Sequence, residues 1–404
     1  MLILLVELAA IFWMAKVLKS KGLRGIHNWL VLALGVQFLL VTIYRLELWT
    51  LGREVYYSDA EIYWNTTLAL LKGADVTTWN MGYVYYCYSI QKTSPFVWAG
   101  FINLSNVLLI DLTGLSLAYV MIENKVPSRN VKTFLAIGLL NPLVIYSLAR
   151  NLKDVLFLFY VSLIILCFHF LTRHNTRRIL LSIALIVLTI LVSEVRPWGF
   201  LVSLSLFGFL YLRWLSKGFR QRPILFYLLS VGIAVLAAIL VIFLKYLGYM
   251  ATLEVWVPIV IENAFSQGLL NLLLAPTRIL TGPGPFRAIQ GAKYFWFYTV
   301  SGNFFAAIGA LLWWFHLGSF GARLITSRLN KNTVSVLLAI TWGLFVIIYS
   351  LQYGGSLELR FRGVIYVLTA ALVMSVVECR ISLKTRALTI IITIVVFAGG
   401  LIFG

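Results

Sequence analysis

The segment from Ile179 to Val195 reads ILLSIALIVLTILVSEV, and its one ionisable side chain, that of Glu194, stands near its end. Arginines border the segment on both sides, with Arg178 before it and Arg196 after it. A helix needs about 20 apolar residues, and roughly 17 at the least, to cross the hydrocarbon core of a bilayer. The segment therefore predicts a membrane-spanning helix whose ends lie at the lipid headgroups.

Apolar runs of this kind recur along the whole chain. Of its 404 residues 61% are hydrophobic and 12% are charged, and the mean hydropathy is +0.94, which excludes a water-soluble globular protein. The pattern predicts one all-α domain over residues 1–404, a polytopic transmembrane helical bundle of about twelve spans, within a range of roughly ten to thirteen. The predicted spans cover residues 1–15, 29–44, 96–121, 133–149, 155–172, 179–195, 198–212, 223–244, 295–315, 333–352, 363–378 and 387–403.

The basic residues orient this bundle. Short loops rich in Lys and Arg stay on the cytoplasmic side, and alternate loops of this chain are rich in both. We therefore place these loops inside and both termini outside. The net charge of +19 follows mainly from this topology, with some attraction to anionic membrane lipid, and requires no nucleic-acid partner. The inside residues are Lys16, Lys19, Lys21, Arg24, Lys125, Arg129, Lys132, Arg173, Arg177, Arg178, Arg213, Lys217, Arg220, Arg222, Arg323, Arg328, Lys331, Arg380, Lys384 and Arg386.

Two outer loops are too long to be simple connections. The first, at 45–95, contains an acidic motif, and the spacing of its residues 59–71 suits a helix that lies along the membrane interface. The second, at 245–294, contains Thr281-Gly282-Pro283-Gly284-Pro285, whose Gly-Pro alternation predicts a shaped loop or a re-entrant turn. We expect the chemistry of the protein to lie on this outer side.

Cations gather at the outer ends of the predicted spans, although most of the 14 acidic residues lie on that side too. Converging Arg and Lys side chains suit an anionic phosphate or pyrophosphate whose lipid tail leaves between helices. Sugar transfer from such a carrier requires cationic stabilisation of the leaving phosphate and a carboxylate that accepts the proton of the attacking hydroxyl. The predicted phosphate-binding residues are Arg150, Lys153, Arg196, Arg278, Arg287, Arg360 and Arg362.

Other chemistries find no support in the sequence. It has no phosphate-binding GxxxxGK[ST] loop, no GxGxxG and no GxSxG motif, so nucleotide hydrolysis and serine hydrolase chemistry are not expected. The four histidines lack metal-ligand spacing, and the three cysteines fall at different depths of the bundle, so we predict neither a histidine metal centre nor a disulfide. Glu7 and Asp111 fall within predicted spans, where an ionisable group faces the bundle interior or marks function.

The acidic motif, Asp59-Ala60 followed by Tyr63 in the first outer loop, resembles that of the GT-C glycosyltransferases, which use polyprenyl- or dolichyl-phosphate sugars. Asn141-Pro142, the stretch from Arg150 to Asp154, and Arg196-Pro197 also resemble the bacterial integral-membrane members of that superfamily. The resemblance covers most of the chain in topology and a small set of residues in motif. It departs from the family pattern in the span that precedes the acidic loop, and in ending without a soluble outer domain after the bundle.

The resemblance implies a function and a location. Asp59 would be the general base, and Glu61 would contact the acceptor or a metal ion. The partners would be an isoprenoid phosphate- or pyrophosphate-linked sugar, membrane lipid, and a glycan, lipid or protein acceptor. The resemblance leaves open whether a divalent cation, Mg²⁺ or Mn²⁺, takes part, and the sequence requires no cofactor. The expected location is the bacterial plasma (inner) membrane.

Two alternative functions remain open at this stage. A polysaccharide polymerase or ligase of the O-antigen or capsule type would depend on arginines that bind pyrophosphate, so Arg278, Arg287, Arg360 and Arg362 would outrank Asp59. A transporter or flippase of lipid-linked sugars would need polar residues along a path through the membrane, as at Glu7 and Asp111.

The selected side chains also have ordinary explanations. The acids of the first outer loop could cap its helix or be solvated. Arg150, Lys153 and Asp154 could form a local salt bridge at a helix end. Arg360 and Arg362 could extend to lipid headgroups.

Overall fold

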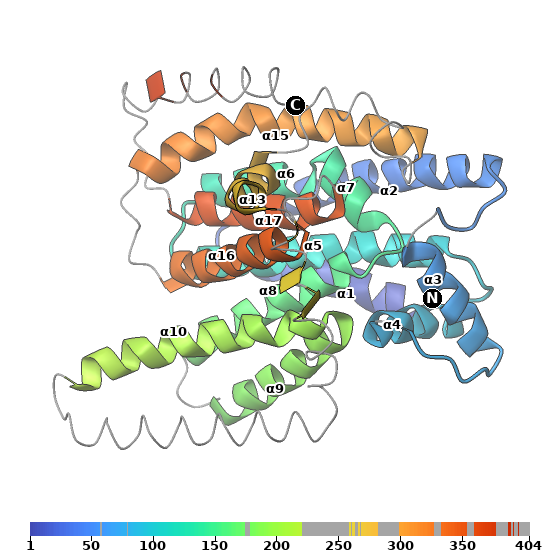
Figure 1. The fold of residues 1–404 in the computed structure, drawn as a ribbon, viewed down its shortest axis with the longest axis horizontal. Helices are drawn as coiled ribbons and strands as arrows, with labels where there is room; N and C mark the ends of the chain where they lie inside the picture. The colour runs from blue at the N-terminus through green and yellow to red at the C-terminus, as the bar shows by residue number, and fades with distance from the viewer. Residues whose placement is uncertain are drawn as a thin grey trace.

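The structure, a computed structural model, describes residues 1–56, 59–78, 80–173, 178–219, 268–281, 299–326, 333–353 and 359–376, with a few isolated residues between 258 and 266 and between 387 and 395. Every element in these ranges is a helix, and most of the long helices run roughly side by side (Figure 1). The elements are α1 (Leu2–Ser20), α2 (Ile26–Thr50), α3 (Asp59–Leu71), α4 (Met81–Lys92), α5 (Gly100–Glu123), α6 (Ser128–Leu139), α7 (Pro142–Ala149), α8 (Asp154–Leu171), α9 (Arg178–Val195), the 3₁₀ helix η1 (Pro197–Gly199), α10 (Phe200–Phe219), α13 (Leu269–Thr281), α15 (Val300–Thr326), α16 (Thr333–Tyr353) and α17 (Leu359–Val376).

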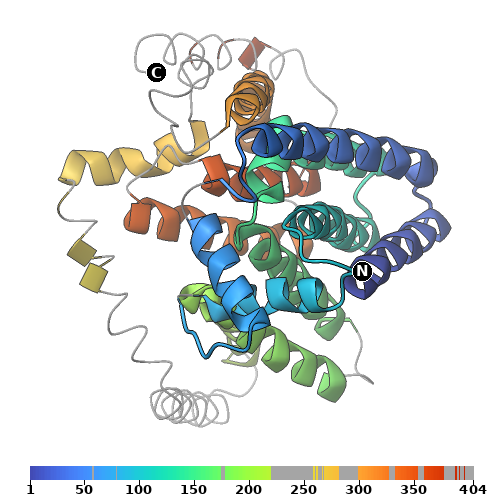
Figure 2. The same ribbon diagram turned by 90° about the vertical axis from the view of Figure 1, so that its right-hand side faces the viewer.

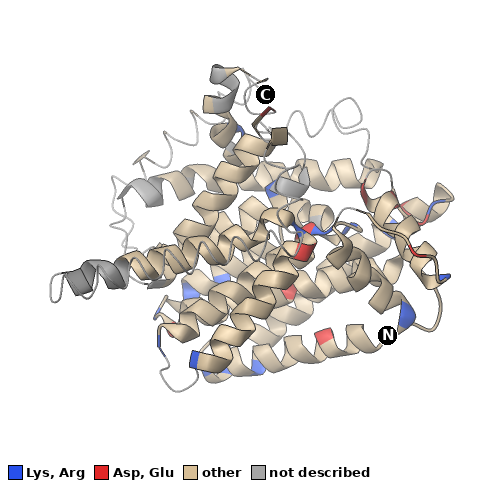
Figure 3. Cartoon of the chain, turned by 60° about the horizontal axis from the view of Figure 1, so that its bottom comes forward, with Lys and Arg blue, Asp and Glu red and all other residues tan. Residues whose placement is uncertain are grey.

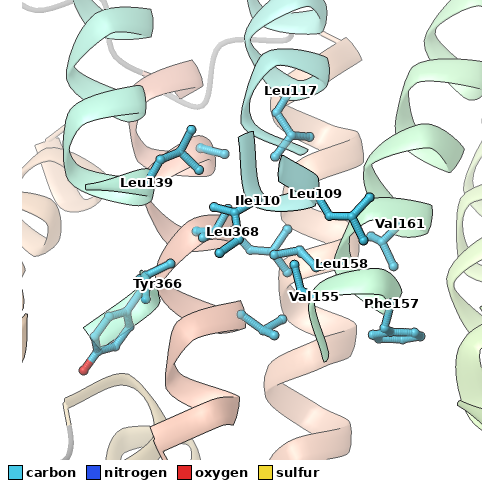
Figure 4. Close-up of a cluster of buried hydrophobic side chains, with 14 of the residues drawn as sticks. Leu109, Ile110, Leu117, Leu139, Val155, Phe157, Leu158, Val161, Tyr366 and Leu368 are labelled. Atoms are coloured by element: carbon cyan, nitrogen blue, oxygen red, sulfur yellow. The ribbon is translucent and has the colours of Figure 1, made fainter. Parts of the chain in front are cut away.

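Helix α5 forms the centre of the bundle. It packs most extensively against α1 and α8, and nearly all its side chains are buried. Leu109 and Ile110 of α5 lie beside Leu158 of α8 in the buried cluster of Figure 4. A helix that is apolar on all sides is stable only when other helices or lipid surround it, which explains its central place.

The structure confirms the prediction that the chain contains helices apolar enough to cross a membrane, but it does not confirm the predicted number of spans. Six described helices are long and apolar enough to cross a membrane. They extend over residues 26–50, 100–123, 154–171, 178–195, 300–318 and 334–352. The expected span at 223–244 and most of that at 387–403 lie outside the described residues. The count of about twelve therefore stays a prediction.

The span predicted at 133–149 is not one continuous helix, because two short helices, α6 and α7, cover it. The helix is interrupted at Leu140 and Asn141, immediately before Pro142. Proline has no N–H group and disfavours helical geometry in the residue before it, so it ends one helix and begins the next. The Asn141 side chain caps α7 by accepting a hydrogen bond from the N–H of Leu143 at 2.9 Å.

Helices α3 and α4 lie across one end of the bundle, the end that faces the viewer in Figure 2. The spacing of polar and apolar residues predicts a helix at 59–71, and α3 confirms this helix. The N-terminal ammonium of Met1 donates to the carbonyl of Thr93 at 2.7 Å, just after α4. The start of the chain and the first predicted outer loop thus share one end of the bundle, which we call the α3–α4 end.

In the part of the chain that the structure describes, Lys, Arg, Asp and Glu residues lie mostly towards the ends of the helices, and few lie in the middle of the bundle (Figure 3). At the end opposite α3 and α4, Glu123 forms ion pairs with Lys21 and Arg173. These three residues come from the loops that the basic pattern places together inside. The geometry thus confirms that these loops share one end of the bundle, while the side of the membrane stays a prediction.

Helix α15 approaches α7 closely because it carries glycine at the contact. A Cβ atom at Gly302 would lie 1.9 Å from the ring of Tyr146, and one at Gly309 would lie 2.3 Å from the backbone nitrogen of Leu143. Glu47 of α2 accepts hydrogen bonds from the N–H groups of Val300 and Ser301, at 2.7 and 3.0 Å. A carboxylate is favourable at a helix N-terminus, so α2 fixes the start of α15.

Candidate functional site

The connection between α7 and α8, residues 150–153, is buried beneath the α3–α4 end. Two asparagines of α5 hold its backbone: Asn103 donates to the carbonyl of Ala149 at 2.7 Å, and Asn106 donates to that of Arg150 at 2.6 Å. Asn103 also donates to the side chain of Asn151 at 2.6 Å. A buried backbone outside regular helix needs such partners, so α5 fixes the position of the corner.

Charged residues are concentrated in this corner and the start of η1. Arg150 is 1% exposed, Lys153 9%, Asp154 0% and Arg196 3%. We call these four residues the charged corner. Its formal charge is positive, because it contains three cations and one carboxylate.

Arg196 and Asp154 form a buried ion pair. The Arg196 guanidinium also lies over three aromatic rings, at 5.5 Å from the centroid of Phe157, 5.9 Å from Trp198 and 5.8 Å from Tyr349. The electron-rich faces of aromatic rings attract cations, so these rings and the carboxylate together orient the guanidinium. Asp154 is in addition the first residue of α8, where a negative charge is favourable.

Lys153 connects the charged corner to α3. Its ammonium group donates to the hydroxyl of Tyr63 at 2.9 Å and lies 5.6 Å from the centroid of that ring. Asn80 donates to the same hydroxyl at 3.1 Å. The ring of Tyr63 packs edge-on against that of Tyr83, with centroids 5.3 Å apart. The first outer loop is thus docked on the charged corner through Tyr63.

Asp59 is the first residue of α3 and stands one turn before Tyr63. Residues four apart lie on the same face of a helix, so Asp59 shares the face that contacts Lys153. Asp59 is partly buried, whereas Glu61 is exposed and lies on a different face. The structure therefore places the two predicted acids on different faces of α3, with Asp59 on the face that carries Tyr63.

Arg150 occupies the side of the corner that faces α2. The hydroxyl of Tyr44 interacts with the Arg150 guanidinium. The ring of Tyr44 packs edge-on against Tyr146 of α7, with centroids 5.7 Å apart. Arg150 thus interacts with α2 through Tyr44, and Lys153 with α3 through Tyr63.

The other predicted phosphate-binding residues are not part of the charged corner as the structure describes it. Arg362 is fully buried and donates to the carbonyl of Arg278, in the last turn of α13. The final carbonyls of a helix lack partners within it, so Arg362 has a structural role there. The side chain of Arg278 is exposed. Arg287, the side chain of Arg360 and the Gly-Pro loop after Thr281 lie outside the described residues.

The described acids do not fit a metal site. In the ranges that the structure describes, no three His, Cys, Asp or Glu side chains gather in a way that could hold a metal ion. Asp59 and Glu61, the two acids of the motif, diverge around α3. We therefore assign no step of a reaction to a divalent cation.

The two acids within the predicted spans accept hydrogen bonds inside the bundle. Glu7 accepts hydrogen bonds from Tyr86 and Ser105, both at 2.7 Å, and Asp111 accepts one from Gln37 at 2.9 Å. Groups that line a transport path need access to water from both sides in turn. Glu7 is 7% exposed and Asp111 is fully buried, so this arrangement favours structural roles.

Several residues of the site were not selected from the sequence. The sequence marks Tyr63 only as part of the acidic motif, and the predicted site does not include Asn103, Asn106 or Tyr44. Asparagine within an apolar segment is costly unless it is hydrogen-bonded, so Asn103 and Asn106 in one predicted span were a usable signal. Nothing local distinguishes Tyr44 from the other 19 tyrosines.

Comparison with models of protein families, with curated proteins and with solved structures found no match.

Proposed function

We propose that this protein is a membrane glycosyltransferase that moves a sugar from a polyprenyl-phosphate-linked donor to a glycan, lipid or protein acceptor. Asp59 is the proposed general base, and Arg150, Lys153 and Arg196 are the proposed partners of the donor phosphate. The proposal includes about twelve spans, a bacterial plasma membrane and a site on its outer face.

One observation carries this proposal: three cationic side chains are buried at one end of the bundle, under the helix face that carries Asp59. Burying a charge is costly, and a surplus of buried cations favours the entry of an anion. A lipid phosphate supplies such an anion and leaves its tail among the apolar helices. A purely structural ion pair, such as Asp154 with Arg196, would not require the two further cations.

The proposed reaction needs two groups from the chain. The cations stabilise the negative charge that develops on the leaving phosphate as the bond between sugar and phosphate breaks. Asp59 accepts the proton of the acceptor hydroxyl while that oxygen bonds to the sugar carbon. The products are the glycosylated acceptor and a free polyprenyl phosphate.

The polymerase or ligase function has less support. Its key arginines would be Arg278, Arg287, Arg360 and Arg362, yet Arg362 is directed to a helix carbonyl and Arg278 is exposed. Transport has less support because Glu7 and Asp111 are enclosed.

The test compares Asp59→Asn with Glu61→Gln, a matched change in the same helical turn. The purified protein is assayed for release of polyprenyl phosphate from native lipid-linked sugars. We expect Asp59→Asn to lower turnover by about 10²- to 10⁴-fold, the usual contribution of a general base, while donor binding is retained. Glu61→Gln should keep most of the turnover, because its side chain is exposed and directed away from the cations.

Two results would contradict the proposal. Full turnover of a folded Asp59→Asn variant would exclude Asp59 as the base. No turnover by the wild-type protein with any lipid-linked sugar would exclude the transferase function and favour transport.

A further inference from the structure

A half-open groove of about 400 Å³ lies between α2 and the start of α5, apart from the charged corner. Its polar rim consists of Arg45, Arg53 and Glu54, and Trp49 and Trp98 stand beside them. Its apolar wall includes Val41, Leu46 and Leu104. The groove thus combines a cationic mouth with an apolar floor, and its volume is within the usual range for small-ligand sites.

Arg45 is the central group of the rim. Its side chain is 11% exposed, and its guanidinium lies over Trp98, with 5.3 Å to the ring centroid. It forms an ion pair with Glu54 at 2.9 Å and also donates to the backbone carbonyl of that residue. Its Nε atom is buried and hydrogen-bonds to no described residue. A guanidinium with a free donor, stacked on an aromatic ring, is suited to bind an oxyanion.

The local charge favours a singly charged anion. Two arginines and one glutamate line the groove, so its formal charge is positive even while the Arg45–Glu54 pair is intact. The Glu54 side chain is half exposed, so it can move aside when a stronger anion approaches. A phosphodiester carries one negative charge and matches this site.

An apolar surface leads from the groove along α2. Leu32, Leu39 and Leu46 follow each other at intervals of seven residues, so they share one face of the helix. They are 59%, 59% and 55% exposed, and α2 is one of the helices apolar enough to cross a membrane. Leu46 is both the last of the three and part of the groove wall. A hydrocarbon chain can therefore continue from the groove along this face without leaving apolar surroundings.

We propose that the groove binds an anionic phospholipid of the surrounding leaflet, with its phosphate at Arg45 and Arg53 and its acyl chain along the leucine face of α2. The charged corner is closed over by α3, whereas this groove opens at the protein surface, so a bilayer lipid enters it by lateral diffusion. The groove is a lipid-binding site additional to the proposed donor site and does not depend on it.

The test uses vesicles of phosphatidylcholine that contain brominated phosphatidylglycerol, whose bromines quench nearby tryptophan. We expect brominated phosphatidylglycerol to quench the tryptophan fluorescence of the wild-type protein more strongly than brominated phosphatidylcholine does. The difference in quenching between the wild-type protein and Trp98→Phe gives the part that arises in the groove. Arg45→Gln should weaken the preference for the anionic lipid about fivefold, the loss expected for one cation at an anionic lipid surface. Lys72→Gln is the matched control, because Lys72 is an exposed cation of the same outer loop.

A second variant separates lipid binding from simple damage to the fold. Glu54→Gln removes the carboxylate that competes with the lipid phosphate for Arg45, so it should strengthen the preference for the anionic lipid. If the Arg45–Glu54 pair were purely structural, Glu54→Gln and Arg45→Gln would weaken lipid binding equally. Equal quenching by the two lipids, or no change in Arg45→Gln, would overturn the proposal. Displacement of the brominated lipid by polyprenyl phosphate at concentrations where phosphatidylglycerol fails would also overturn it, and would assign the groove to the carrier lipid.

Discussion

Among the residues that the structure describes, ion pairs lie at both ends of the helices, and the pairs of Glu123 and of Asp154 differ in their surroundings. Glu123 pairs with Lys21 at 2.5 Å and with Arg173 at 3.3 Å, and the two cationic side chains are 38% and 39% exposed. Asp154 and Arg196, at the α3–α4 end, are 0% and 3% exposed. The same kind of ion pair is therefore accessible to water around Glu123 and enclosed by protein around Asp154.

Exposed ion pairs indicate which loops lie at the same end of the bundle, whereas buried charges need a structural or functional explanation. An exposed pair contributes little, because water and salt screen it. A buried charge is maintained only where aromatic rings, helix ends and hydrogen bonds compensate for lost water, as around Arg196. The hydrogen bond to Glu123 raises the pKa of Lys21 from its ordinary value.

The largest expected effect breaks the buried pair. Asp154→Asn leaves the Arg196 charge buried without its carboxylate, so we expect the free energy of unfolding to fall by about 3–5 kcal/mol. Thermal unfolding of the purified protein in detergent measures this. Adding Arg196→Gln to Asp154→Asn should recover part of the lost free energy of unfolding. If Asp154→Asn destabilised the protein less than Glu123→Gln does, the charged corner would not be a low-dielectric site.

Tyr63→Phe tests the connection between α3 and the corner. It removes the hydroxyl that accepts hydrogen bonds from Lys153 and Asn80, so we expect a loss of about 1–3 kcal/mol, typical of a buried donor that loses its partner. Tyr85→Phe is the matched control, because the Tyr85 side chain is 54% exposed on α4. Equal unfolding temperatures for the two variants would mean that Tyr63 does not dock the loop.

Glu123→Gln tests the exposed pairs at the opposite end. We expect a change of about 0–1 kcal/mol, and one that disappears at high salt, because both partner cations are accessible to water. Unfolding temperatures at low and high ionic strength provide the measurement. A loss that persists at high salt would place these charges in the same class as Asp154.

The smallest expected effect is an absence of reaction at Cys87, which is 1% exposed on α4. Burial raises the pKa of its thiol to about 12. Because the raised pKa favours the protonated form, the reactive thiolate is scarce below that pH, roughly one part in ten thousand at pH 8. With Cys167 and Cys379 replaced by alanine, a water-soluble maleimide should leave the folded protein unlabelled at pH 8.

Glu61→Cys in the same background is the control for that experiment, since its side chain is exposed and should label rapidly. Labelling of Cys87 at a similar rate would show that α4 does not stay packed against the bundle. Labelling of Cys87 only after unfolding would support the closed α3–α4 end.

The sequence indicated individual residues of the candidate site, but it did not indicate which of them lie together in the folded protein. Arg150, Lys153 and Arg196 were selected because they stand at predicted span ends, and the structure brings them to one corner with Asp154. Arg362 was selected on the same ground, yet it binds a helix carbonyl. Position at a span end is a local property, whereas the partner of a long side chain depends on which helices pack together, and this explains the different outcomes.

Composition and periodicity by themselves determined that the chain forms apolar helices and that the loops of Lys21, Glu123 and Arg173 share an end, because hydropathy and charge act over one segment at a time. The tertiary structure decided three further points: the break at Pro142 within a predicted span, the burial of the charged corner under α3, and the contact of Tyr63, on the face of α3 that also carries Asp59, with Lys153. These depend on contacts between residues far apart in the chain, such as Tyr63 with Lys153 and Asn106 with the backbone of Arg150. No local pattern records such contacts, since packing against distant helices selects them.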